Sequence, residues 1–152
     1  SLIRRDLLLE HDIFWRSDIR MGEDTLFLIE VMAAAEQIEY LDHSTFIYVK
    51  SANFAASSTQ TYGDRELRNH LIVWRTATET LAKIGLDYVA LRLQIGLQTA
   101  LRAMIFVNQG DIAQETFADF ANFLRANAET INRFNFSTRL RELIEVARSA
   151  DA

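Results

Sequence analysis

The stretch "DRELRNHLIVWRTATETLAKIG", residues 64–85, carries the pattern that decides the fold class. It predicts a helix from about Asp64 to Ile84, closed by Gly85, because glycine readily takes the left-handed conformation that follows many helices. A helix with one apolar stripe must pack that stripe against other elements, which predicts a mainly helical domain. The stripe follows helical spacing and consists of Leu67, Leu71, Trp74, Leu81 and Ile84.

Three more helices are predicted after this one. The first runs from Asp87 to about Asn108, and the last starts near Ser137. Asp111 is expected to cap the helix between them, because Gln114 lies three residues on and completes a capping box. Short connections favour antiparallel neighbours, so we expect a four-helix bundle-like region. The apolar positions of its last three helices include Leu91, Ile95, Leu101, Met104, Ile105, Phe117, Phe120, Leu124, Leu140, Leu143, Ile144 and Ala147.

The composition agrees with a mainly helical chain. The 152 residues are 49% hydrophobic and 24% charged, with no proline and 5 glycines, whereas β-rich folds use these two residues freely in turns. The absence of cysteine excludes disulfides and thiolate metal ligands. A formal charge of −5 argues against a general nucleic-acid surface, so no nucleic-acid partner is predicted.

The first part of the chain has a different pattern. A helix is predicted from Glu23 to Ala35, and because its apolar residues surround most of the axis we expect it to be buried. Two strand-like runs follow, "QIEYL" from Gln37 and "TFIYV" from Thr45, both rich in β-branched or aromatic residues. These elements predict a short α/β portion with two strands.

The stretch "KSANFAASSTQTYGD", residues 50–64, is typical of a loop or linker because it is rich in small and polar residues. We therefore divide the chain into residues 1–60, the α/β portion, and residues 61–152, a helical accessory domain. The chain begins at Ser1 without a methionine, and we interpret it as a fragment of a longer protein.

Two adjacent carboxylates, Glu23 and Asp24, stand at the start of the predicted first-part helix. Acids are common there because they suit the positive end of the helix dipole, so the pair can be explained as a helix-start signal alone. An ionised carboxylate held near a cleft can also accept a proton from a hydroxyl nucleophile. The residues by themselves leave both interpretations open.

The wider stretch "LIRRDLLLEHDIFWRSDIRMGEDTLFLIEVMAAAEQIEYLDHSTFIYV", residues 2–49, resembles the C-terminal half of the catalytic domain of family 2 glycosyltransferases, which have the GT-A fold. Five elements match in order, and residues 1 to about 60 are covered. They are the segment from Leu2 to Leu8, Ile13–Phe14, the "GEDTLF" motif at Gly22 to Phe27, Ile38 to Asp42, and Phe46 to Tyr48.

The resemblance implies an inverting transfer of a sugar from a nucleotide-sugar donor to a hydroxyl of a glycan or glycolipid acceptor. Asp24 takes the position of the family's general base, and Glu23 would bind acceptor hydroxyls or orient the base. Trp15 is a candidate for stacking on the acceptor sugar, although core packing explains it equally well. Lys50 and Ser57 are the candidates for contacts with the donor diphosphate.

The resemblance also implies Mg²⁺ or Mn²⁺, which the family binds through a DxD motif to neutralise the leaving diphosphate. The sequence has no DxD motif and no counterpart of the nucleotide-binding half. We therefore expect the metal only in the full-length protein, none bound by this chain, and no activity from this chain alone. His11, His43 and His70 are too scattered to predict a metal site.

The helical part carries no catalytic pattern, and acceptor positioning, membrane association and homo-oligomerisation all stay open for it. The expected location is cytoplasmic, with a peripheral position at the membrane as one option. The alternative to the transferase is a non-catalytic helical interaction or regulatory module whose "GED" only starts a helix. Neither the donor sugar and nucleotide nor the acceptor is specified by these residues.

Overall fold

The computed structural model describes residues 2–40, 42–43, 61–107 and 110–149. These residues are mainly helical, as predicted, and none of them forms a strand. The helices are α1 (Arg5–Glu10), α2 (Glu23–Ala34), α3 (Asp64–Ala82), the π-helical turn η2 (Val89–Leu93), α4 (Gln94–Phe106), α5 (Gln114–Ala126), α6 (Ala128–Asn132) and α7 (Thr138–Ser149).

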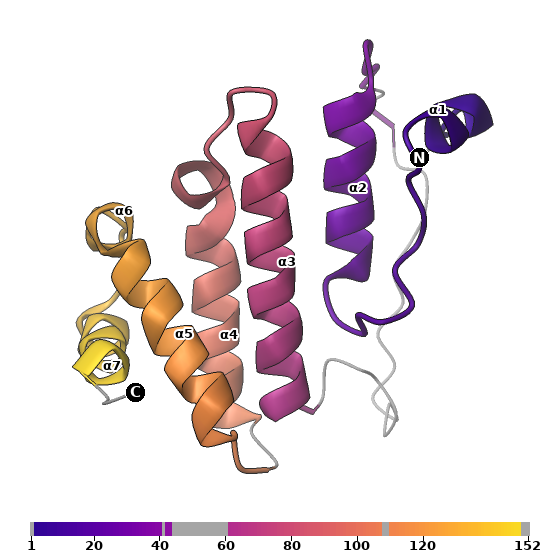
Figure 1. Cartoon of the computed structure of the whole chain (residues 1–152). Coiled ribbons are helices and arrows are strands. Elements are labelled where there is room, and N and C mark those ends of the chain that lie inside the picture. The colour runs from indigo at the N-terminus through magenta and orange to yellow at the C-terminus, as the bar shows by residue number, and fades with distance from the viewer. Residues whose placement is uncertain (1, 41, 44–60, 108–109, 150–152) are drawn as a thin grey trace.

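Helix α3 is the central element of the fold. Figure 1 shows it between α2 on one side and α4 with α5 on the other, while α7 packs on the outer side of α5. Its apolar stripe explains this position, because Leu67, Leu71 and Trp74 are almost completely buried. The helix ends at Ala82, and Gly85 follows with a left-handed φ of 75°, as expected for a residue that stops a helix.

The predicted third helix of the second part starts later than expected. Asp111 does not cap it, because α5 begins at Gln114 and its first flanking residue is Ala113. The backbone N–H of Ala113 instead donates to Oδ1 of Asp64 over 3.0 Å, so an acid at the start of α3 replaces the local cap. A contact between residues so far apart in the chain leaves no local sequence signal, which is why the capping-box prediction was wrong.

The last helix agrees closely with its prediction, since α7 begins one residue after Ser137 and buries Leu140, Ile144 and Ala147. Between α5 and α7 lies the short helix α6, which was not predicted. Asn127 lies between α5 and α6, and its side-chain N–H donates to the carbonyl of Phe123 over 2.8 Å. Helix α6 contributes Ile131 to the core.

The prediction that α2 is buried on all sides was wrong. Only Leu26 and Val31 are fully buried, and Leu28 and Met32 are exposed on the side away from α3. A single neighbouring helix covers one face only, and among the described residues α2 packs mainly on α3.

The strand predicted from Gln37 is also absent, because residues 37–40 adopt no regular structure and Ile38 and Tyr40 are exposed. A strand needs a hydrogen-bonded neighbour, and no described residue supplies one to this segment. The strand predicted from Thr45 lies outside the described residues, as does the proposed boundary near residue 60. The described residues therefore give no support to the α/β portion of the fold prediction.

None of the described helices combines the length and the apolar composition that crossing a bilayer requires.

Gly22 precedes α2 and lies against Val73 of α3. Its φ of 85° is left-handed, and a Cβ built on it would lie 3.0 Å from Cγ2 of Val73. Both features disfavour a side chain here, so backbone geometry and packing both favour the glycine that precedes the two acids.

Replacing this glycine tests the packing with a matched control. Gly85→Ala introduces the same left-handed strain with no atom within 4 Å, and it should lower the free energy of unfolding by about 1–2 kcal/mol. Gly22→Ala should cost about 1–3 kcal/mol more, because the new methyl group collides with Val73. Urea unfolding measures both. In a Val73→Ala background the two penalties should become equal, and a difference that persists there would exclude this contact as the cause.

Candidate functional site

The two acids of the "GED" motif occupy the first turn of α2, as predicted. Glu23 is partly buried, whereas Asp24 is exposed. Oδ1 of Asp24 accepts the backbone N–H of Thr25 over 2.7 Å and lies 3.3 Å from its hydroxyl. The carboxylate is thus held at the positive end of the helix and remains accessible to a molecule arriving from solvent.

The loop before α2 is tied to α3, which fixes where this first turn lies. The side-chain oxygen of Asn69 accepts the backbone N–H of Arg20 over 2.9 Å, and Asn69 is itself buried. Ile19 and Leu26 on either side of the acids are buried in the same apolar cluster as α3. The position of the two carboxylates therefore depends on α3, from the second part of the chain.

Trp15 lies beside this helix start. Its ring centroid is 5.5 Å from that of Phe27, with the planes tilted by 48°, and 56% of Trp15 is exposed. Phe27 follows Glu23 by four residues and Asp24 by three, so it belongs to the same helix face as the acids. The structure thus places an exposed aromatic surface next to the carboxylates, and Trp15 is not a core residue.

The remaining predicted site residues, Lys50 and Ser57, lie outside the described residues. The structure therefore describes three of the five candidates, Trp15, Glu23 and Asp24, and relates Trp15 to the two acids through Phe27. Within the described ranges, no group of three histidines or acids is placed to hold a metal ion.

A second polar cluster, which the sequence analysis did not identify, lies on α3. The hydroxyl of Tyr62 is 2.8 Å from Nδ1 of His70, and the His70 ring stacks on Trp74 with a centroid distance of 5.3 Å. Burial lowers the pKa of His70 to about 4, although the charge of Glu66 acts in the opposite direction. Burial, followed by Glu66, also raises the pKa of Tyr62 above its usual range. In the sequence, the spacing of Glu66, His70 and Trp74 on one helix face could have indicated this cluster.

The contacts within this cluster are structural. Glu66 is buried but accepts hydrogen bonds of 3.0 and 2.7 Å from the guanidinium of Arg65, which leaves its charge compensated. His70 is neutral and hydrogen-bonded to Tyr62. This bond holds Tyr62, which precedes α3, against the helix. Trp74 covers the His70 ring on the side that faces the core.

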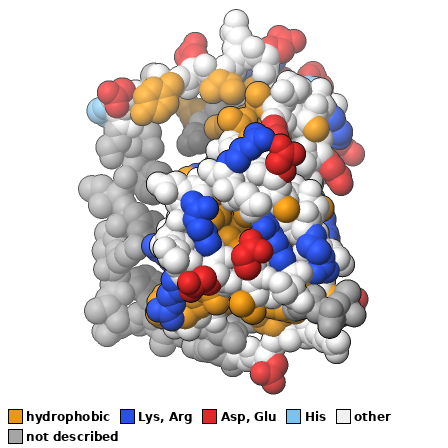
Figure 2. All heavy atoms as spheres, turned by 90° about the vertical axis from the view of Figure 1, so that its left-hand side faces the viewer, with side chains coloured by type: hydrophobic (Ala, Val, Ile, Leu, Met, Phe, Trp, Pro, Cys, Tyr) orange, Lys and Arg blue, Asp and Glu red, His pale blue; other side chains and the backbone are white. Residues whose placement is uncertain are grey.

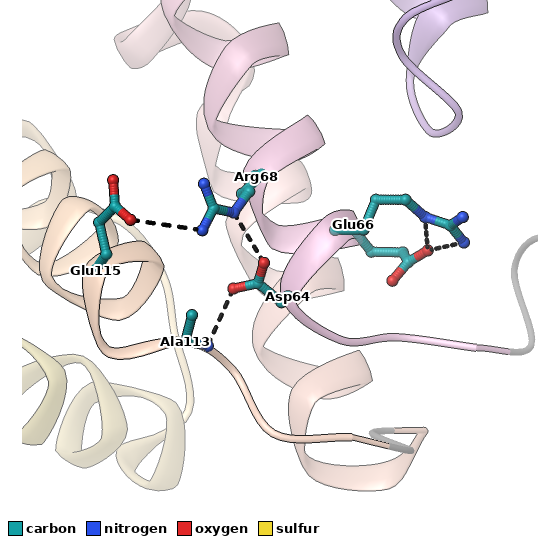
Figure 3. A network of polar contacts seen from close by, with 6 residues as sticks. Asp64, Glu66, Arg68, Ala113 and Glu115 are labelled. Carbon is teal, nitrogen blue, oxygen red and sulfur yellow. Dashed lines mark hydrogen bonds and ion pairs between the residues drawn. The ribbon is translucent and has the colours of Figure 1, made fainter.

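A network of charged groups joins the start of α3 to the start of α5 (Figure 3). Asp64 accepts from Arg68 over 2.8 Å, and Arg68 also lies 3.9 Å from Glu115 of α5. The pKa of Asp64 is lowered first by the Thr116 hydroxyl, which approaches it without reaching hydrogen-bond geometry, and then by Arg68 and the N–H of Ala113. The network connects the two helices, and its charged groups are paired with one another.

Comparison of the chain with models of known protein families, with curated proteins and with solved structures gives no match. The family resemblance of the first part therefore stays a prediction, and the site is defined by its own geometry.

His70 makes the stability of the fold depend on pH. Its pKa is about 4 in the folded chain and 6.5 in the reference state, so the unfolded chain binds a proton more readily between these values. The free energy of unfolding should fall by about 3 kcal/mol as pH drops through this window. Chemical unfolding at a series of pH values measures the slope.

His70→Gln removes the titrating group and should flatten the curve between about pH 6.5 and 4, because the side chain stays neutral throughout. The exposed His11 provides the control, and His11→Gln should retain the slope of the parent chain. An unchanged slope in His70→Gln would assign the pH dependence to other groups. Asp64 and Asp119 titrate in a separate window, because their lowered pKa values lie below 3.8.

Proposed function

We propose that this chain is the acceptor-side part of an inverting, nucleotide-sugar-dependent glycosyltransferase of family 2, with Asp24 as the general base. The observation that carries the proposal is the exposed Asp24 carboxylate at the start of a helix whose same face carries Phe27, the residue that the exposed ring of Trp15 contacts. Together with the "GEDTLF" motif, this arrangement supports a transferase better than a helix start without a chemical role.

The reaction that this geometry supports is a single displacement. The acceptor hydroxyl attacks the anomeric carbon of the donor as the bond to the nucleotide diphosphate breaks. One carboxylate on the acceptor side must then take the hydroxyl proton. Asp24 meets the requirement because its carboxylate is accessible and anchored, and a first helical turn favours a negative charge.

The neighbouring groups have positioning roles in this proposal. The exposed ring of Trp15 offers an apolar platform for a sugar ring, and Glu23 can accept hydrogen bonds from acceptor hydroxyls. Lys50 and Ser57 are proposed to contact the donor diphosphate. The donor's Mg²⁺ or Mn²⁺ does not fit the described residues, which offer no cluster of metal ligands, and we assign it to the nucleotide-binding half.

The proposed setting is the cytoplasmic side of the membrane, with an acceptor that belongs to a cell-surface polysaccharide or a glycolipid. Residues 61–152 would act as an accessory domain that positions the catalytic helix, since Asn69 and Val73 of α3 contact the loop before Glu23. A homo-oligomer through the helical region is part of the same proposal.

Asp24→Asn should abolish transfer, because an amide cannot accept the proton from the acceptor hydroxyl. The activity is measured as transfer from nucleotide sugars, in a chain that also contains the nucleotide-binding half. Loss of a general base predicts a fall in kcat of about 10²–10⁴-fold. Asp6→Asn is the matched control, since Asp6 is another exposed acid in the first turn of a helix. Full activity of Asp24→Asn would exclude Asp24 as the general base, whereas absence of transfer by the parent chain would favour a non-catalytic helical module.

Trp15→Ala should act on acceptor binding and not on the chemical step. Loss of one aromatic contact predicts a rise in the acceptor KM of about 2–10-fold with little change in kcat. The neighbouring Phe14 is exposed to a similar degree, and Phe14→Ala should leave the acceptor KM unchanged. Equal effects of the two substitutions would indicate a general loss of packing instead of a sugar contact.

A further inference from the structure

Helix α4 and the preceding turn η2 are apolar on two opposite faces. The inner face packs into the core through Leu93, Leu97, Ala100 and Leu101, as an amphipathic helix should. The outer face is also apolar, because Leu91 is 67% exposed, Ile95 is 55% exposed and Phe106 is 74% exposed. A helix that is apolar all round normally has both faces covered.

The outer residues form one stripe, in which Thr99 and Arg102 lie between the apolar Ile95 and Phe106. Exposed positions recur at 91, 95, 99, 102 and 106, which is the spacing of one helix face. Thr99 does not interrupt it, because its hydroxyl donates to the carbonyl of Ile95 over 2.9 Å. The stripe from Leu91 to Phe106 is about 22 Å long. Large apolar side chains exposed on one helix face indicate a candidate site of interaction.

The charges along the stripe have a single sign. Between Asp87 and Asp111 the sequence contains no acidic residue, while Arg92 and Arg102 are exposed on the outer side of the helix. Arg102 also lines a pocket of about 140 Å³ with Arg139 of α7, together with apolar Ile105, Phe106 and Leu140 and with Ser137.

Neither Arg102 nor Arg139 forms a hydrogen bond or ion pair within the described part of the chain, whereas Arg75 and Arg148 each pair with an acid. On the side that carries α7, basic side chains lie around exposed apolar surface, with acidic ones among them (Figure 2). The pocket thus combines two available guanidinium groups with an apolar wall.

We propose that the outer face of η2 and α4, together with Arg139, lies on a phospholipid surface that carries anionic headgroups. The apolar stripe would rest among the upper acyl carbons, as interfacial helices do. Arg92 and Arg102 would meet headgroup phosphates, and the pocket between Arg102 and Arg139 would take one phosphate, because guanidinium groups bind phosphate oxygens in a bidentate manner.

The charges favour a lipid surface over a second copy of the chain. In a symmetric dimer the same patch would face itself, so Arg102 and Arg139 would approach their own counterparts. The sequence from Tyr88 to Gly110 offers no acid to pair with them, and on α7 the acid next to Arg139 is the exposed Glu142. An anionic lipid surface supplies both the negative charge and the apolar contact that the stripe lacks.

The test is flotation of the chain with lipid vesicles. We expect binding to vesicles of phosphatidylcholine mixed with phosphatidylglycerol, little binding to phosphatidylcholine alone, and weaker binding at high salt. Arg102→Gln and Arg139→Gln should each reduce the partition coefficient about fivefold, since each removes one cation from the surface. Phe106→Ser should reduce binding as well. Circular dichroism checks that the variants fold.

Matched controls separate this surface from general charge and hydrophobicity. Arg5→Gln removes the same charge from α1, and Val146→Ser removes an equally exposed apolar side chain from α7, so both should bind like the parent chain. Equal binding to neutral and anionic vesicles would overturn the proposal, as would wild-type binding by Arg102→Gln and Arg139→Gln. A dimer in sedimentation that dissociates in Phe106→Ser would assign the stripe to a second copy instead. Stabilisation of the folded chain by inorganic phosphate, without binding to vesicles, would mean that the pocket binds only a soluble anion.

Discussion

The close contact between Trp74 of α3 and Gly96 of α4 is the constraint on which the rest of the helical arrangement depends. A Cβ at Gly96 would lie 2.9 Å from Nε1 of Trp74, so only glycine lets the two helices approach this closely around the buried indole. Phe123 of α5 contacts the same ring with a centroid distance of 5.4 Å. One aromatic side chain therefore sets the positions of α4 and α5 relative to α3.

The same helix also positions the candidate catalytic acids. Asn69 holds the backbone of Arg20, and Val73 leaves room only for a glycine at position 22. Both residues lie within a turn and a half of Trp74 on α3. Packing at the centre of the helical part thus reaches Asp24 through two helices and one loop, and so decides where the candidate catalytic carboxylate lies.

The sequence predicted the features that depend on interactions between residues close together in the chain. Helical spacing and burial coincide in α7 and in α3 from Leu67 to Trp74, so these stripes were recoverable. Ile84, predicted as the last member of the α3 stripe, lies beyond the end of the helix and is 48% exposed. The cap of α5 was not, because Asp64 replaces Asp111 from a distant part of the chain. Of the candidate site, Glu23 and Asp24 were readable from a motif at a helix start, whereas the contact of Trp15 with Phe27 depends on how a loop folds back. The prediction of a strand from Gln37 was wrong because alternating residues specify a strand only where a partner strand is present.

The two surfaces proposed for this chain lie on different sides of α3. Helix α2 carries Asp24 on one side and α4 carries the apolar stripe on the other (Figure 1), and among the described residues α2 packs mainly against α3. A helix with its side chains is about 10 Å wide, so the width of α3 separates the two helices. The two proposed surfaces therefore share no residues, and a substitution on the outer face of α4 tests the lipid proposal without changing the contacts of Asp24.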